Sequence, residues 1–171
     1  MPRRNVQFTQ GGYYHIYNRG ANRMPIFVES DNYEFVLRRL KRYLQKLALT
    51  LIAYCLMPNH YHLLVVSTHG NLSRAMAYLS SAFSRRLNDR FHWEGSVFRG
   101  RFNNRVVTEP AHWLYLLPYI HLNPVRAHLA PSLELSRWTS HGIYAGELSC
   151  PDWLQTKVML SELGGEAGYR Q

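Results

Sequence analysis

Two apolar runs on either side of a Pro-Asn turn place the strongest constraint on the fold. The first run covers residues 50–56 and the second covers residues 60–66, with Met-Pro-Asn between them at 57–59. Short apolar runs that flank such a turn are typical of a β-hairpin. The sequence therefore predicts an antiparallel pair of strands in the middle of the chain.

The second run carries two histidines, His60 and His62. Successive side chains alternate between the faces of a strand, so these two share one face and Tyr61 points the other way, into the core. Their Cα atoms would lie about 6.6 Å apart, close enough for both imidazoles to hold one metal ion. Taken alone, the pair is better explained as two half-exposed histidines on an ordinary strand, so a metal site requires further ligands.

Composition narrows the class of partner and compartment. The chain has 171 residues and a net charge of +9, with twelve tyrosines and four tryptophans, which favours a polyanion with stackable bases. No apolar run approaches the roughly 20 residues of a membrane span, and the N-terminus lacks the apolar core of a signal peptide. Cys55 and Cys150 form no CxxC motif. We therefore expect a reduced, cytoplasmic protein without a membrane partner.

Periodicity and turn residues predict an α+β fold. The elements expected in order are a strand at 12–17, a helix opened by a capping box of Asp31 and Glu34, the hairpin, a helix capped by Asn71, a strand at 101–107 and a helix that begins at Pro110. The order β-α-β-β-α-β with a trailing helix is ferredoxin-like (split βαβ), an antiparallel sheet with helices on one face. We expect this domain to cover 1–130, followed by an appendage at 131–171.

The trailing helix supplies residues that could complete a site. Tyr119 and Asn123 are four residues apart and share a helix face, although Pro118 would kink a continuous helix. A tyrosine is a nucleophile that can hold a covalent intermediate. An amide oxygen is a hard ligand that could complete a His-His-Asn site for Mg²⁺ or Mn²⁺. A core aromatic and a helix cap are the simpler interpretations of the two residues.

Several collinear segments resemble a known family. MPNHYHLLV at 57–65 and YIHLNPVRA at 119–127 are similar to the single-tyrosine transposases of the HUH endonuclease superfamily, and in particular to the REP-associated tyrosine transposases, which are relatives of insertion-sequence-200-like transposases. Supporting segments follow in family order: YYHIYNRG at 13–20, GSVFRGRF at 95–102 and a C-terminal segment at 138–146. Tyr61 departs from the family pattern, which prefers an aliphatic residue between the histidines.

The resemblance implies a site and an activity. It places metal ligands at His60, His62 and Asn123 and the nucleophile at Tyr119. It implies a metal-dependent (Mg²⁺ or Mn²⁺) endonuclease and strand transferase that acts on single-stranded or hairpin DNA through a 5′-phosphotyrosine, as a monomer or homodimer. The residues expected to contact DNA are arginines and two phenylalanines that would stack on bases, namely Arg38, Arg39, Arg42, Arg85, Arg86, Phe98, Arg99, Arg101, Phe102, Arg105 and Arg126.

Two other functions remain open from the sequence. A non-catalytic module that binds single-stranded nucleic acid is the main alternative, because this sheet topology commonly serves that purpose. A structural zinc site is a further alternative, which the lack of a Cys or His as third ligand disfavours. A covalent adduct between protein and DNA would distinguish the transposase from both.

Overall fold

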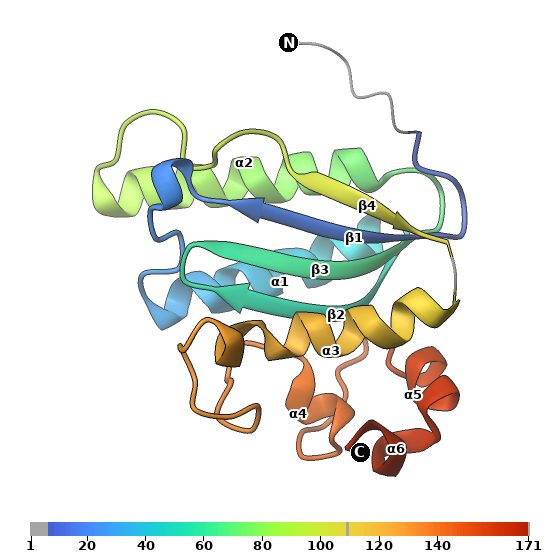
Figure 1. Ribbon diagram of the computed structural model, residues 1–171. Helices are drawn as coiled ribbons and strands as arrows, with labels where there is room; N and C mark the ends of the chain where they lie inside the picture. Colours follow the sequence, from blue (N-terminus) through green and yellow to red (C-terminus); the bar gives the residue numbers. More distant parts are fainter. Residues whose placement is uncertain (1–6, 109, 171) are drawn as a thin grey trace.

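The computed structural model describes residues 7–108 and 110–170 (Figure 1). The main elements run in the order that the sequence predicts, and short helices follow them. They are β1 (Gly12–Arg19), the 3₁₀ turn η1 (Ala21–Arg23), α1 (Ser30–Lys46), β2 (Leu49–Met57), β3 (His60–Ser67), α2 (Leu72–Phe91), β4 (Asn103–Val107), α3 (Pro110–Arg126), α4 (His141–Tyr144), α5 (Lys157–Leu163) and α6 (Gly165–Tyr169). In the described part of the chain, no helix combines the length and the hydropathy needed to cross a membrane.

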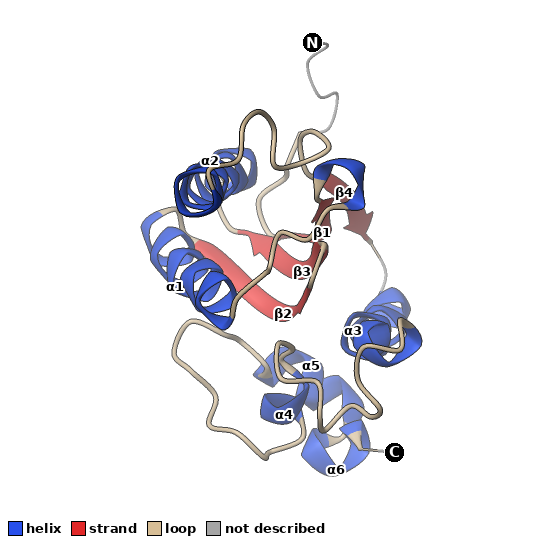
Figure 2. Cartoon of the chain, turned by 90° about the vertical axis from the view of Figure 1, so that its left-hand side faces the viewer, coloured by secondary structure: helices blue, strands red, loops and turns tan. Residues whose placement is uncertain are grey.

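The four strands form one antiparallel sheet in the order β2-β3-β1-β4. Helices α1 and α2 pack side by side on one face of this sheet, and α3 lies across the other face (Figure 2). The predicted ferredoxin-like α+β fold is therefore confirmed. The face opposite α1 and α2 is only partly covered, since α3 packs mainly on β2 at one side of it.

The β2–β3 hairpin has the predicted turn and the predicted alternation. Pro58 and Asn59 alone connect its strands. Tyr61 is 2% exposed and belongs to the core beneath α1 and α2, as the sequence predicts. Leu64 belongs to a second core beneath α3. Because His62 lies two residues from Leu64, it shares the α3 face of the sheet.

Two helices differ in detail from the sequence prediction. Helix α1 begins at Ser30, and its capping box joins Glu29 to Asn32, so the predicted box of Asp31 and Glu34 is wrong. Both of those carboxylates instead pair with Arg38 one or two turns along the helix. Helix α3 continues through its internal prolines, Pro118 and Pro124, without ending.

Residues 131–170 pack against the outer edge of β2. The amide of Leu56 donates to the carbonyl of Trp138 (2.9 Å), and the amide of Ser140 donates to the carbonyl of Tyr54 (3.0 Å). Further along, the amide of Gln155 donates to the carbonyl of Leu51 (2.9 Å). These bonds cover an edge strand that would otherwise expose unpaired backbone groups. The segment predicted as an appendage is thus packed onto the domain, beside α3.

His121 links this segment to α3 through a buried hydrogen-bond chain. Its Nε2 lies 2.7 Å from Oγ of Ser140, and its Nδ1 lies 2.6 Å from the hydroxyl of Tyr169 in α6. Burial, reinforced by the positive charge that His141 can carry, lowers the pKa of His121 from 6.5 to about 3. The imidazole is therefore neutral in the folded protein near neutral pH.

Acid is expected to destabilise the protein through His121. Its pKa is lower in the folded than in the unfolded chain, so its stabilising contribution is complete above about pH 6.5 and is lost as the pH falls toward 3. Between these limits, the contribution of His121 to the slope of the unfolding free energy against pH approaches about 1.4 kcal/mol per pH unit. Urea denaturation from pH 7 to pH 4 measures it, and His121→Asn, which cannot titrate, should flatten the slope. An equal slope in the variant would contradict this assignment.

Candidate active site

His60 and His62 extend from β3 on the face of the sheet toward α3. Their ring centroids are 5.1 Å apart. His62 is buried, with 6% exposed, and His60 is half-buried at the end of the strand. Pairing in the sheet places Tyr17 of β1 beside His62 and Arg19 beside His60. The predicted shared face of the two histidines is therefore present.

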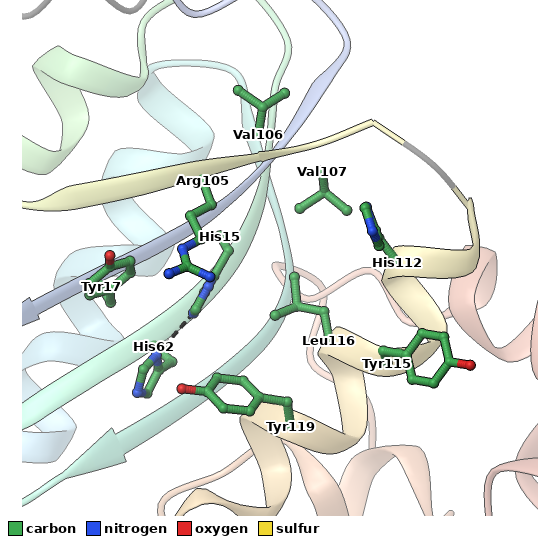
Figure 3. A pocket seen from close by; sticks show the side chains of 10 residues that line it. All are labelled: His15, Tyr17, His62, Arg105, Val106, Val107, His112, Tyr115, Leu116 and Tyr119. Atoms are coloured by element: carbon green, nitrogen blue, oxygen red, sulfur yellow. Dashed lines mark hydrogen bonds between the residues drawn. The ribbon is translucent and has the colours of Figure 1, made fainter.

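Tyr119 and Asn123 approach these histidines from α3. The ring centroid of Tyr119 lies 5.7 Å from that of His62, and the Tyr119 hydroxyl is directed toward His62 (Figure 3). Nδ2 of Asn123 donates to the carbonyl of Tyr119 (2.6 Å), as the predicted i, i+4 relation on one helix face allows. This bond leaves Oδ1 as the atom of the Asn123 amide that can accept or coordinate.

A cavity of about 560 Å³ joins the four predicted residues, which we call the polar cavity. It is lined by His60, His62, Tyr119 and Asn123 together with Tyr17, Asn18, Arg19, Arg99, Gly100, Arg101 and Asn103. All four proposed catalytic and ligand residues therefore meet in one cavity of a single chain. Positive side chains surround them, which suits an anionic substrate.

Hydrogen bonds orient both imidazoles. Nδ1–H of His60 donates to Oδ1 of Asn59 (2.6 Å). Nδ1 of His62 lies 2.9 Å from Nε2 of His15, which extends from the neighbouring strand β1. When His62 is the donor in this pair, the Nε2 atoms of His60 and His62 both keep their lone pairs. Ligand histidines in metal sites commonly use their second ring nitrogen in this way.

Burial keeps both imidazoles neutral. The pKa of His60 is lowered from 6.5 to about 4 by burial and then by the positive charge of Arg19. The pKa of His62 is lowered to about 3 by burial, followed by the neighbouring His15, His60 and Arg19. Neutral imidazole is the form that coordinates a metal ion.

The donor set fits a hard divalent cation better than zinc. Across residues 7–108 and 110–170, no group of three or more His, Cys, Asp or Glu side chains is arranged to hold a metal ion. The ligands at hand beside the two imidazoles are amide and substrate oxygens, which Mg²⁺ and Mn²⁺ accept. Structural zinc sites, in contrast, are closed by four Cys or His ligands.

Other phenols near the site differ in their placement. Tyr61 is buried on the opposite face of the sheet, and Tyr115 is 79% exposed with its hydroxyl directed away from His62 (Figure 3). Tyr17 is a rival nucleophile, because its ring centroid lies 6.0 Å from that of His62. The sequence did not point to it. His15 and Arg19, on the same face of β1, were also not identified as site residues.

The arginines predicted to bind DNA fall on two sides of the molecule. Arg99 and Arg101 line the polar cavity, Arg105 lies on β4 near His15, and the Arg126 guanidinium lies 5.9 Å from the Tyr119 ring centroid. The other five lie on the helices that cover the opposite face of the sheet, namely Arg38, Arg39, Arg42, Arg85 and Arg86. The second group is remote from the site.

Contacts within the helical layer occupy several of these remote arginines. Arg38 pairs with Asp31 and Glu34, and Arg86 pairs with Asp31. The guanidinium of Arg39 lies 5.1 Å from the ring centroid of Phe35. These contacts favour a structural role for Arg38, Arg39 and Arg86.

Phe98 and Phe102 do not form the predicted stacking surface. They are only 6% and 7% exposed and belong to the core beneath α1 and α2. Phe98 packs near Tyr61 and Phe83, with ring centroids 6.2 and 6.3 Å away. Their rings are used for packing, so a clamp in this segment depends on Arg99 and Arg101.

Comparisons with known proteins agree with this architecture. The family model described as "Transposase IS200 like" matches residues 9–121, more than half of the chain. A REP-associated tyrosine transposase bound to a REP hairpin is similar in fold, with a TM-score of 0.73 and 12% identity over 88% of this chain and 89% of that chain.

Two further structural matches have TM-scores below 0.5. A proposed transposase from Deinococcus radiodurans R1 has a TM-score of 0.45 at 20% identity, over 67% of this chain and 93% of that one. A bacterial tRNA(His) guanylyltransferase-like protein in complex with GTP has a TM-score of 0.42 at 8% identity, over 71% and 68%. No curated protein matches the chain in sequence beyond chance. Its match to the family model shows that the chain belongs to the IS200-like transposases, a family of DNA-nicking enzymes.

Proposed function

We propose that the protein is a metal-dependent endonuclease and strand transferase that acts on single-stranded DNA through a tyrosine nucleophile. The observation that carries this proposal is the Tyr119 hydroxyl, which faces a pair of neutral imidazoles in one positively charged cavity. Membership of the IS200-like transposase family supports it. The sequence predicts a cytoplasmic protein, and we propose that it acts there on DNA.

His60, His62 and Asn123 would hold the cation through Nε2, Nε2 and Oδ1. The two imidazoles are oriented by Asn59 and His15, and each presents a free Nε2 lone pair when His62 is the donor to His15. When bound, Mg²⁺ or Mn²⁺ would polarise the scissile phosphate and offset the charge that develops on its oxygens.

Tyr119 would attack the phosphorus atom of the scissile phosphodiester. The new bond joins the phenolic oxygen to the 5′-phosphate, and the bond to the 3′-oxygen breaks. The phenol gives up its proton to solvent and the 3′-oxygen takes one up to become a free 3′-hydroxyl, so the protons balance. A second 3′-hydroxyl can then attack the phosphotyrosine and release Tyr119, which rejoins DNA without nucleotide hydrolysis. Arg19, Arg99 and Arg101 would bind the flanking phosphates.

The substrate we propose is single-stranded or hairpin DNA. The REP-associated tyrosine transposase of similar fold is bound to a REP hairpin, which supports this choice. All four proposed site residues come from one chain, so a monomer would be able to supply the whole site. A homodimer is the other state that we predict from the resemblance.

Incubation with a library of DNA hairpins and Mn²⁺, followed by a denaturing gel, tests the function. We expect a protein band shifted by covalently attached DNA, and we expect a chelator to abolish it. Binding of hairpins without any adduct under these conditions would favour the alternative, a non-catalytic nucleic-acid binding module. That alternative does not require the phenol and the two imidazoles to meet.

Loss of His15 is expected to weaken metal binding while leaving the DNA affinity near that of wild type. In His15→Phe, Nδ1 of His62 loses its partner, so the tautomer with a free Nε2 is no longer favoured. Loss of such a partner typically costs about 10- to 100-fold in metal affinity. Manganese binding followed by electron paramagnetic resonance measures the effect.

Two further results would separate a positioning role of His15 from general damage. His15→Gln offers an acceptor oxygen and should recover part of the metal affinity. Excess Mn²⁺ should restore cleavage by His15→Phe. Wild-type manganese affinity in His15→Phe would exclude the positioning role.

A further inference from the structure

A second cavity adjoins the polar cavity along α3. It has a volume of about 540 Å³, and we call it the aromatic cavity. It shares His62, Tyr17 and Tyr119 with the polar cavity. Its other lining residues, shown in Figure 3, are His15, Arg105, Val106, Val107, His112, Tyr115 and Leu116.

The two cavities differ in their chemistry. Arg19, Arg99, Arg101, Asn18, Asn103 and Asn123 make the first suitable for phosphate and cation. In contrast, the second presents valine, leucine and tyrosine side chains with a few polar groups, and its volume lies in the roughly 300–1,000 Å³ range of small-ligand pockets. In a nucleotide, only the sugar separates the base from the phosphate. When the phosphate lies at Tyr119, which lines both cavities, the base is therefore close to the aromatic cavity.

Arg105 is the strongest hydrogen-bond donor of the aromatic cavity. It lies on the edge strand β4, opposite His15 of β1, and in Figure 3 its guanidinium extends over the cavity near His15 and Tyr17. Arg105 is exposed, and no carboxylate forms an ion pair with it within the described residues. A planar fork of N–H donors matches two adjacent acceptors, which is the arrangement that guanine O6 and N7 present.

Resting on the proposed function, we propose that the aromatic cavity binds one unpaired guanine of the DNA strand, at a nucleotide flanking the scissile phosphate. Arg105 donates to O6 and N7 of the base, and Tyr17 and Tyr115 provide aromatic surface for its ring. Proteins commonly read unpaired bases in this way, by stacking together with hydrogen bonds to an exposed edge. Arg105 thus selects a base, whereas the arginines of the polar cavity bind phosphate irrespective of sequence.

The test measures binding alone, so that it does not depend on catalysis. Tyr119→Phe protein is titrated with short fluorescent single strands in which each position in turn is guanine, adenine, cytosine or thymine, so that no cleavage point has to be known beforehand. We expect guanine at one position to bind roughly 5- to 150-fold more tightly than the other bases, the range for one bidentate arginine contact. Arg105→Gln in the same background should remove this preference.

Arg99→Gln is the matched control, because Arg99 lines only the polar cavity. It should weaken binding of all four strands alike. It should also make the plot of log binding constant against log salt concentration less steep by about 0.7, the value for one phosphate contact on a single strand. Equal affinity for the four bases, preference for another base, or guanine preference that survives Arg105→Gln would each overturn the proposal. If guanine preference depends on Arg105 but no hairpin ever forms an adduct, the proposed catalysis fails while this binding site stands.

Discussion

Tyr119→Phe is expected to fold, to bind hairpin DNA with near wild-type affinity and to form no covalent adduct. Phenylalanine keeps the ring that packs against His62 and His15 and removes only the attacking oxygen. Loss of a nucleophile that acts together with its neighbours typically costs about 10⁴-fold or more. A denaturing gel measures the adduct, and a gel-shift titration measures hairpin affinity.

The matched variants are Tyr17→Phe and Tyr115→Phe. Tyr17 also lies beside His62, so it is the stricter control, whereas the hydroxyl of Tyr115 faces away from the site. Both variants should still form the adduct. Full adduct formation by Tyr119→Phe together with its loss in Tyr17→Phe would move the nucleophile from α3 to β1.

His60→Ala and His62→Ala are each expected to abolish cleavage while retaining hairpin binding. Each removes one of the two imidazole nitrogens that we assign to the cation, and the remaining oxygens of Asn123 and the substrate hold it weakly. Manganese affinity of the free protein should fall in parallel with cleavage. His62 is buried, so the melting temperature of each variant should be compared with that of wild type.

Chelation provides the independent control for these histidine variants. Excess chelator should reduce wild-type cleavage to the level of His60→Ala, and added Mn²⁺ should reverse that loss in wild type alone. Undiminished cleavage in chelator would show that the imidazoles act without a cation. Histidine variants that retain wild-type manganese affinity would place the cation elsewhere.

Local patterns predicted the parts of the fold that local interactions determine. Alternation along residues 60–66 was enough to place His60 and His62 on one face and Tyr61 on the other, because one-residue slips would expose the core side chains. Helical spacing likewise placed Tyr119 and Asn123 together. The N-cap of α1 was placed two residues too far along the chain, at Asp31 instead of Glu29, since a carboxylate is favourable anywhere near a helix N-terminus.

Contacts that depend on strand order were beyond local patterns. His15, Tyr17 and Arg19 enter the site because β1 pairs with β3 in one particular register. Their alternation on one face of the first strand was a signal, although nothing in the sequence connected that face to the histidine pair. The choice of partner strand is made by the tertiary packing of both cores.

The residues predicted to contact DNA differ in burial and position, which the sequence did not reveal. Phe98 and Phe102 flank exposed arginines, yet their rings belong to the core because the loop closes over α2. The arginines of α1 and α2 are attached to a helical layer that faces away from the site. Residues 131–170 lack periodicity because their helices are short and their attachment is made by long-range bonds, such as that from the Tyr144 hydroxyl to the carbonyl of Ile52.

The most direct test of the proposed mechanism is mass spectrometry of the peptide that carries the DNA after wild-type protein has reacted with a hairpin and Mn²⁺. We predict a single adduct on Tyr119, attached through the 5′-phosphate, with a 3′-hydroxyl on the released strand that a polymerase can extend. An adduct on Tyr17, on a histidine or through a 3′-phosphate would contradict it.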